Sequence, residues 1–519
     1  TTTAANPNGG ISGAVNITAG NGGAASSSTT GTGRAGGTIT LTAGNGGASG
    51  SSNVGGVGGS FVFTAGNGAA SNGGAGNFTF NGGTIVSLPA FTHTAGTVTI
   101  KANQTVSLAV TGTYTLTAGS LILENGYTVL NTGIFSSSGT GTRSITFGQT
   151  AGGIPPYIGL THTTAATTVL SMSTVTGFTW TGTGGFTVAD MAVARTFNFG
   201  GTAGGTTSNA PNLTFTTGAS IATITSAGWF NTLNFTGSTS TPASSTVNVN
   251  NLILASGGTY TSLGVAMVGT GTITPTGKTI SALTINHTGT TTLVTGLQIN
   301  GALTLTEGTL DGGIGYSIQC NTFASTGTAT RSITAPDGAV INVMGSGATA
   351  FSNASAAGIT IVGYTINMNS DSAKTFAGGG ASYAILHQSN SSGLQPGVLT
   401  ISGNNSFTNL KYNQDLTTLT STITFTISTT QTFTAFTLSG TAGNVITIDS
   451  STPGTQATLS KSSGTVSVDY LSIKDSNATG GATWYAGANS VDAGNNTGWI
   501  FTVPPAPSTN TGNFFLFFN

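Results

Sequence analysis

The chain has 519 residues, of which 82 are glycine and only 4% are charged. Ten Lys and Arg side chains against eleven Asp and Glu leave a net charge of −1, so the cations are too few to form a nucleic-acid-binding face. A hydrophobic share of 37% excludes charge-driven disorder, and the composition excludes a helical bundle or a coiled coil. Thr, Ser and Asn take the place of charge, which predicts a surface that responds little to salt.

A short repeat dominates the first segment, residues 1–83. The sequence Thr-Ala-Gly-Asn-Gly occurs at Thr18–Gly22, Thr42–Gly46 and Thr64–Gly68. Each copy follows a short alternating run such as Thr38–Leu41, which is typical of a strand. A strand, a tight turn and a loop of small residues, repeated every 22 to 24 residues, is the pattern of a solenoid.

Short alternating strands continue through the middle of the chain. Thr97–Ile100, Tyr114–Thr117 and Thr422–Ile427 alternate apolar and polar residues, and Ser120–Leu123 is more apolar. Gly, Asn, Ser and Thr turns separate these runs. No run has apolar residues at helical spacing, so we predict no helix.

The middle of the chain also contains a longer duplication. Phe135–Thr146, which reads FSSSGTGTRSIT, matches Phe323–Thr334, which reads FASTGTATRSIT. A weaker similarity links Ala194–Phe197 to Ala373–Phe376. These matches predict two related modules in succession.

The sequence therefore divides into five segments. They are the glycine-rich repeats at 1–83, a first solenoid module at 84–275, a second at 276–440, a C-terminal β cap at 441–503, and a proline linker with an aromatic tail at 504–519. The cap prediction rests on Trp484, Trp499 and the alternating segment Val466–Ile473, since bulky residues can close the open end of a coil.

The fold predicted for the whole chain is all-β, a parallel β-solenoid rod, with tandem β-sandwiches as the alternative. A repeat of 22 to 24 residues favours the solenoid, because a sandwich needs about 100 residues. At about 20 residues a turn and about 4.8 Å between turns, we expect on the order of 20 turns and a rod near 100 Å long. With so little charge to guard its strand edges, such a rod must be capped or joined to partner subunits.

The aromatic tail is the candidate for joining subunits. Five consecutive apolar side chains exposed to water would aggregate, so we predict that they dock onto a neighbouring copy or pack on the chain's own last turn. The five residues are Phe514, Phe515, Leu516, Phe517 and Phe518.

No constellation of residues indicates catalysis, a cofactor or a metal. The four histidines, which are His93, His162, His287 and His387, lie far apart and have no metal-ligand spacing. The nearest carboxylate pairs are Glu307 with Asp311 and Asp469 with Asp475, and we interpret them as solvated turn residues rather than a glycosidase pair. The single cysteine, Cys320, lies in an alternating run and is predicted to be a small buried apolar residue.

The three Thr-Ala-Gly-Asn-Gly copies, together with the closing segments Asp469–Ile473 and Asn495–Trp499, resemble the repetitive β-solenoid proteins of phage fibres and of bacterial extracellular filaments and adhesins. The resemblance implies a structural or attachment role without a cofactor, and assembly into trimers or filaments.

We therefore expect a non-enzymatic, multimeric virion fibre or spike component, found at the virion surface or outside the cell. The alternative is a self-assembling extracellular filament or surface-layer adhesin subunit of a bacterial or archaeal cell, and a third reading is a polysaccharide-degrading enzyme. The expected partners are further copies of the chain and cell-surface glycans, with no nucleic acid. No run of about 18 apolar residues predicts a membrane span.

Overall fold

The computed structural model describes a large part of the chain beyond the N-terminal repeats. The described residues are 77–80, 85–148, 155–163, 167–172, 176–188, 195–199, 210–216, 222–225, 229–235, 246–254, 257–390, 395–412 and 420–506. The chain divides into two compact units, Thr1–Gly66 and Asn67–Asn519, and every described residue belongs to the second. The three repeat copies and the aromatic tail lie outside the described residues.

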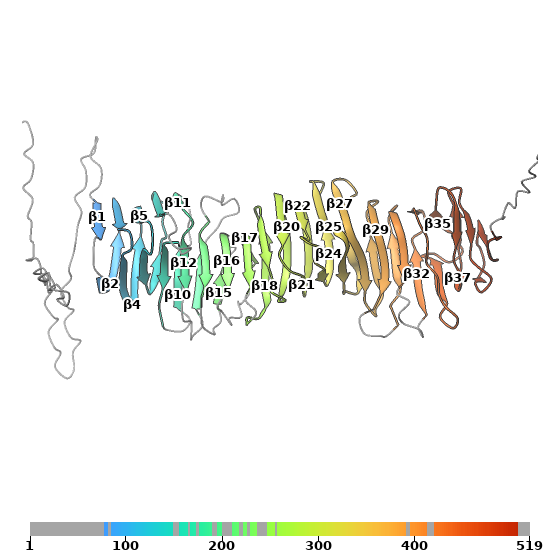
Figure 1. Cartoon of the computed structure of the whole chain (residues 1–519), viewed down its shortest axis with the longest axis horizontal. Coiled ribbons are helices and arrows are strands. Elements are labelled where there is room, and N and C mark those ends of the chain that lie inside the picture. Colours follow the sequence, from blue (N-terminus) through green and yellow to red (C-terminus); the bar gives the residue numbers. More distant parts are fainter. Residues whose placement is uncertain are drawn as a thin grey trace, which may run out of the picture. The chain divides into compact units, whose positions relative to one another are not determined.

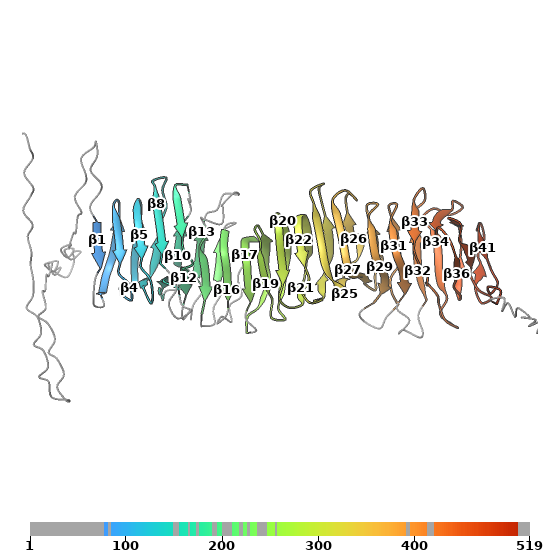
Figure 2. The same cartoon turned by 45° about the horizontal axis from the view of Figure 1, so that its top comes forward.

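The second unit is a parallel β-solenoid of about 15 turns, as predicted. Its described residues form strands and no helix, and every pairing between two strands is parallel. Figure 1 shows successive turns following one another along the long axis from β1 to β37, and the view in Figure 2 agrees. The parallel pairing excludes the tandem β-sandwich alternative, because sandwich sheets are antiparallel.

Three sheets contain these strands. The first consists of β1 (Asn77–Phe80), β3 (Thr97–Ile100), β5 (Gly119–Leu123), β8 (Arg143–Phe147) and β11 (Phe178–Thr181). The smallest consists of β36 (Thr465–Ser467), β39 (Thr483–Tyr485) and β41 (Trp499–Ile500).

The largest sheet runs along the whole stack. Its first half consists of β2 (Ile85–His93), β4 (Thr105–Leu116), β6 (Val129–Thr132), β7 (Ile134–Ser136), β9 (Tyr157–Leu160), β10 (Thr167–Met172), β12 (Gly185–Val188), β13 (Arg195–Phe199), β14 (Asn212–Phe215), β15 (Ala222–Thr225), β16 (Trp229–Phe235), β17 (Thr246–Leu254), β18 (Tyr260–Met267), β19 (Gly271–Thr274), β20 (Thr279–Leu293) and β21 (Leu297–Ile299). Its second half consists of β22 (Ala302–Asp311), β23 (Ile318–Cys320), β24 (Thr322–Ser325), β25 (Arg331–Val343), β26 (Gly347–Asn353), β27 (Ile359–Asn369), β28 (Lys374–Ala377), β29 (Ser382–Ser389), β30 (Leu399–Ser402), β31 (Ser406–Tyr412), β32 (Ser421–Phe425), β33 (Thr430–Phe433), β34 (Ile446–Ser450), β35 (Ala457–Ser460), β37 (Leu471–Ile473), β38 (Ser476–Thr479) and β40 (Val491–Asp492).

The length of a turn varies along the stack. Leu283 pairs with Leu303, and Leu303 with Phe323, so these turns take 20 residues each. Phe323 pairs with Phe351, a turn of 28 residues, and Phe351 pairs with Phe376. Because many turns carry extra loop residues at their corners, the described stack has fewer turns than the roughly 20 that a uniform short turn predicts.

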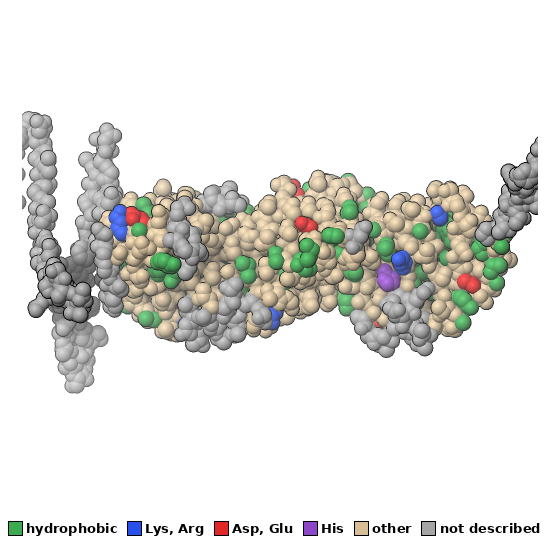
Figure 3. Space-filling model, in the orientation of Figure 1, with side chains coloured by type: hydrophobic (Ala, Val, Ile, Leu, Met, Phe, Trp, Pro, Cys, Tyr) green, Lys and Arg blue, Asp and Glu red, His purple; other side chains and the backbone are tan. Residues whose placement is uncertain are grey.

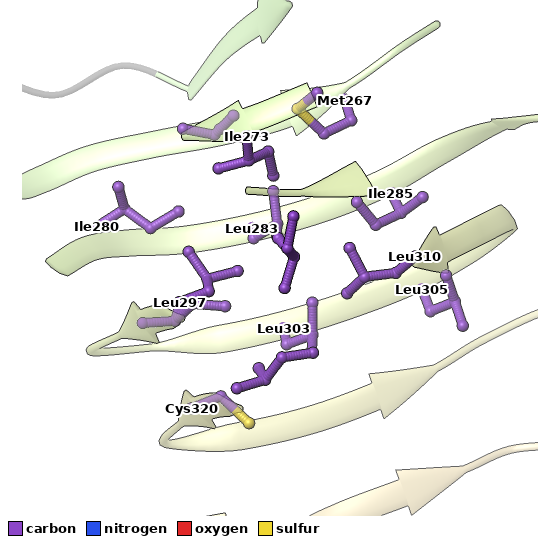
Figure 4. Close-up of a cluster of buried hydrophobic side chains, with 14 of the residues drawn as sticks. Met267, Ile273, Ile280, Leu283, Ile285, Leu297, Leu303, Leu305, Leu310 and Cys320 are labelled. Carbon is purple, nitrogen blue, oxygen red and sulfur yellow. The ribbon is translucent and has the colours of Figure 1, made fainter. Parts of the chain in front are cut away.

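Alternation of side chains explains how each strand contributes to the core. In β32, Ile423 and Phe425 are buried, whereas Thr422 and Thr424 point outward and are half-buried. Parallel register repeats this arrangement on each turn, since Ile423 pairs with Ile448 and Thr424 with Asp449. The inward residues of successive turns therefore merge into one core, and Figure 4 shows part of it.

Aromatic side chains form a ladder inside the second half of the stack. The rings of Phe323 and Phe351 are stacked with their centroids 4.4 Å apart, and those of Phe351 and Phe376 are 4.5 Å apart. Phe407 and Phe433 continue the ladder at 5.7 and 5.8 Å. Stacked and tilted ring contacts of this kind stabilise the core beyond the apolar area that they bury.

Amide side chains form a second ladder, from half-buried Asn212 and Asn231 to buried Asn250. Asn231 Nδ2 donates to Asn212 Oδ1 at 3.1 Å, and Asn250 Nδ2 donates to Asn231 Oδ1 at 3.2 Å. Each amide lies one turn beyond the last. These uncharged side chains therefore form hydrogen bonds from turn to turn, as the backbone amides do.

The segment 441–503 continues the parallel stack, since β34 pairs with β37 and β35 with β38. The predicted single strand over Val466–Ile473 is wrong, because the chain breaks between β36 and β37. Tyr470 has a φ of +55°, and the Asp469 carboxylate accepts the main-chain N–H of Tyr470. This corner moves the chain from one sheet to another, and the segment boundaries stay predictions.

Bulky residues do gather near the end of the described stack. The Trp484 and Trp499 rings meet edge to face at 5.1 Å, and Phe436 lies 5.4 Å from Trp484. All three side chains are buried, so they fill the core of the last turns.

We expect Phe351→Ala to lower the free energy of unfolding by about 3–5 kcal/mol, because it empties a fully buried place between two stacked rings. The measurement is chemical denaturation of the full chain. Val362→Ala, at a side chain that is 52% exposed, is the control and should change it by less than about 0.5 kcal/mol. Equal effects of the two substitutions would contradict the ladder.

Candidate functional site

A hollow of about 440 Å³ lies on the outward side of the stack, over β9, β12 and β14. Parallel register places two rows of outward residues beside it. Asn131, Gly159, Thr187 and Thr214 lie in one row on four successive turns. The neighbouring row consists of Tyr157, Gly185 and Asn212. A glycine in each row interrupts the side chains, which is why the surface is hollowed there.

Close packing requires glycine at both interruptions. A Cβ on Gly159 would lie 2.3 Å from Asn131 Oδ1, and one on Gly185 would lie 2.3 Å from the carbonyl oxygen of Asn212. Real Cβ atoms do not approach that closely, so a side chain at Gly185 would have to move the main chain of the neighbouring turn, whereas one at Gly159 would have to displace the Asn131 amide.

The rim of the hollow is held by the amide of Asn212. Its Nδ2 donates to the carbonyl oxygens of Thr183 and Gly184 at 2.8 and 3.2 Å, and its Oδ1 accepts from Asn231. The loop that precedes β12 is thereby fixed against β14. These hydrogen bonds fix the shape of the hollow among the described residues.

The lining is uncharged and combines two aromatic residues, Tyr157 and the buried Phe186, with hydroxyl and amide groups. The Tyr157 ring lies beside the gap at Gly159, with its Cε2 atom 3.6 Å from where a Cβ would be. Thr187 and Thr214 are half-buried, and within the described part of the chain their hydroxyls have no hydrogen-bond partner. Asn131 Nδ2 donates to Ser107 at 3.2 Å, which leaves its Oδ1 as a further acceptor. Such a surface can bind a polar, neutral ligand.

Glu307 and Asp311, the first carboxylate pair considered from the sequence, both lie on β22. Asp311 Oδ1 accepts the main-chain N–H of Gly313 at 3.0 Å, as in a turn. Glu307 lies opposite Asn286 of the preceding turn. Burial lowers the pKa of nearby His287, and Glu307 partly opposes that effect.

Asp469 and Asp475, the second pair, are hydrogen-bond acceptors that hold corners of the last turns. Asp469 accepts from Asn489 Nδ2 at 2.7 Å, and Asp475 accepts from Asn495 Nδ2 at 2.6 Å. Burial raises the pKa of Asp469, but bonds from Asn489 and the main chain outweigh it and lower the pKa overall. The bond from Asn495 lowers the pKa of Asp475. Both carboxylates are thus occupied structurally.

Two of the histidines are buried strand residues with closely similar bonding. His93 Nε2 donates to the carbonyl oxygen of Gly96 at 3.2 Å, so its Nδ1 accepts the Tyr114 hydroxyl at 3.1 Å. His287 Nδ1 accepts the N–H of Gly289, so its Nε2 donates to Thr291. Burial lowers the pKa of both histidines, which favours the neutral ring.

The duplicated segments bury an arginine at the same place. Arg143 and Arg331 both have no exposed surface. Arg143 donates to Gly141 O and Thr176 O, and Arg331 donates to carbonyl oxygens of its own loop and of the next turn's loop, at Ser355 and Ala357. The matching sequence therefore marks a corner where a guanidinium joins two loops.

Lys374 is a further buried cation, and it lies within the weaker sequence match, at the position that buried Arg195 holds in the other copy. Its Nζ donates to Ser370 O at 2.6 Å and to Gly397 O at 3.3 Å. Burial lowers the pKa of Lys374 to about 8, and nearby Asp371 only partly opposes this. Carbonyl oxygens hold this ammonium group in place, while desolvation makes its charge costly.

The prediction for Cys320 is confirmed, since it is a free thiol buried in the aliphatic core (Figure 4). Burial raises its pKa to about 12, so the thiolate is not formed near neutral pH. The proposed docking residues Phe514 to Phe518 lie outside the described residues, and their role stays a prediction.

Among the described residues, no group of three or more His, Cys, Asp or Glu side chains is placed to hold a metal ion. No helix within those residues is long and apolar enough to cross a membrane. No family model, curated protein or solved structure matches the chain.

Sequence reasoning did not find the hollow. Its signals are glycines inside strands, at Gly159 and Gly185, which mark close backbone approach. In a chain with 82 glycines these two have no distinguishing feature until the register is known.

Lys374 makes stability depend on pH. Its pKa is about 8 when folded, against an ordinary value of 10.5, so between these values the unfolded chain binds more protons. Stability from this group is therefore lowest below pH 8 and rises above it. Between pH 8 and 9.5, we expect the free energy of unfolding of the wild type to rise by about 1 kcal/mol per pH unit relative to that of Lys374→Met.

Denaturant titrations at several pH values measure this difference. Lys411→Met, at an exposed lysine, is the control. Its free energy of unfolding should change with pH in parallel with that of the wild type. If the Lys374→Met curve is parallel as well, the ammonium group is not desolvated as described.

Proposed function

We propose that the chain is a non-enzymatic attachment rod, a multimeric component of a virion fibre or spike that is exposed to the surrounding medium. The observation that carries this proposal is the uninterrupted parallel stack, in which one core runs from β3 to the last turns. A stack of this kind is long and stiff, and each turn contacts only its neighbours.

The surface of the stack supports exposure to an uncontrolled medium. Figure 3 shows few charged side chains on the face in view, which is dominated by uncharged groups. Lys101 and Glu124 form an ion pair at 2.6 Å. Polar ladders such as the Asn212 series replace charge, so salt and pH have little to act on.

The C-terminal end of the described stack supports assembly. Val491, Ile500 and Val503 there are 54%, 37% and 63% exposed. The short strands β40 and β41 are the last members of their columns, so each presents an unpaired backbone edge among the described residues. Apolar side chains beside an open edge favour contact with another copy or with the chain's own tail.

The alternative is a subunit of an extracellular cellular filament or surface-layer adhesin. The same exposed end favours it, because end-to-end contacts that do not close produce an open filament. The two proposals differ in how assembly stops.

Electron microscopy of the purified full chain, beside a copy that ends at Val503, separates them. For a fibre component we expect short rods of one fixed length and a small fixed subunit number, with or without residues 504–519. Open-ended filaments that disappear on truncation would contradict the fibre proposal and support the filament subunit. Globular particles without an elongated shape would contradict both.

A further inference from the structure

We propose that the hollow over β9, β12 and β14 binds a neutral oligosaccharide. This inference rests on the proposed attachment role, for which it names the class of ligand and the place of contact. It is argued from the described lining alone.

The shape of the hollow suits a small ligand rather than a protein. Its volume of about 440 Å³ lies within the range of about 300–1,000 Å³ for small-molecule sites. Two glycines form it; a Cβ at Gly185 would clash with the main chain of Asn212, and the Asn212 side chain holds the rim. The cavity is therefore preorganised, and binding needs little ordering of the chain.

The chemistry of the lining selects the ligand. None of the described lining residues carries a charge, so neither an anion nor a cation finds a partner. Hydroxyls of Thr187 and Thr214 can both donate and accept, and Asn131 Oδ1 can accept. A sugar presents the complementary set, because each of its hydroxyls also donates and accepts.

The Tyr157 ring supplies the apolar part of the site. Tyr157 pairs in register with Gly185, so the residue directly opposite it on the next turn has no side chain to cover the ring. The apolar C–H face of a sugar ring can stack on such an aromatic surface while its hydroxyls reach the threonines. An apolar peptide would leave those hydroxyls without partners, which costs free energy.

Absence of carboxylates from the described lining predicts binding without cleavage. Glycoside hydrolysis uses two carboxyl groups across the scissile bond, and none lines the hollow. The bound saccharide should therefore be released unchanged.

The test uses the full chain and a panel of neutral tetrasaccharides built from glucose, mannose, galactose or N-acetylglucosamine, each at about 10 mM, with ligand-observed NMR and then titration calorimetry. We expect at least one member to bind. Tyr157→Ala should weaken it by about tenfold or more, and Thr187→Val with Thr214→Val by about fivefold. Tyr157→Phe keeps the ring and should stay within about threefold.

Tyr485→Ala is the matched control, because Tyr485 is a half-buried strand tyrosine far along the chain from the hollow, and it should leave the affinity unchanged. No binding by any member of the panel would overturn the proposal. So would equal affinity in wild type and in a folded Tyr157→Ala protein, or a loss on Tyr157→Phe as large as on Tyr157→Ala.

The outcomes separate this inference from the proposed function. Rods seen by microscopy without saccharide binding would remove the site and leave the attachment rod. Binding followed by new reducing ends would retain the site and overturn the non-enzymatic role.

Discussion

Parallel hydrogen bonding between successive turns is the constraint on which the rest of this structure depends. Each turn pairs in register with the turns before and after it, so a residue's neighbour is chosen by strand position rather than by distance in sequence. Thr304 thus lies between Thr284 and Ala324, and Ser352 lies between Ala324 and Ala377. The core ladder of phenylalanines, the asparagine ladder and the glycine gaps of the hollow all follow from the same register.

Much of the fold could be predicted from the sequence, because period-two alternation is a local signal. Thr97–Ile100 is a strand in the structure as predicted, and the buried Cys320 follows from its alternating run. The break at Tyr470 could not be predicted, since the run around it alternates well. It depends on a left-handed backbone at one residue and on an Asp469 carboxylate that gathers N–H groups. Pairing of Phe323 with Phe351 likewise depends on loop lengths that alternation does not reveal.

The candidate site was harder to predict than the fold, because it is created by glycines, which have no side chain. Gly159 and Gly185 become informative only when their partners Asn131 and Asn212 are known. The duplicated segments show the opposite case. Their shared arginine was visible as sequence, but its burial against carbonyl oxygens at Arg143 and Arg331 needed the structure. Buried cations held by carbonyl oxygens recur at loop corners, so some of the few charged side chains of this chain lie inside the stack.

The most direct test of the account measures distances along one outward row. Spin labels at Ala266→Cys with Ser402→Cys are separated by six turns, and labels at Thr304→Cys with Ser402→Cys by four. Buried Cys320 should take no label. At about 4.8 Å a turn, electron–electron resonance should give about 29 and 19 Å, a difference of about 10 Å. Equal distances, or a shorter one for the pair that includes Ala266→Cys, would contradict the in-register stack.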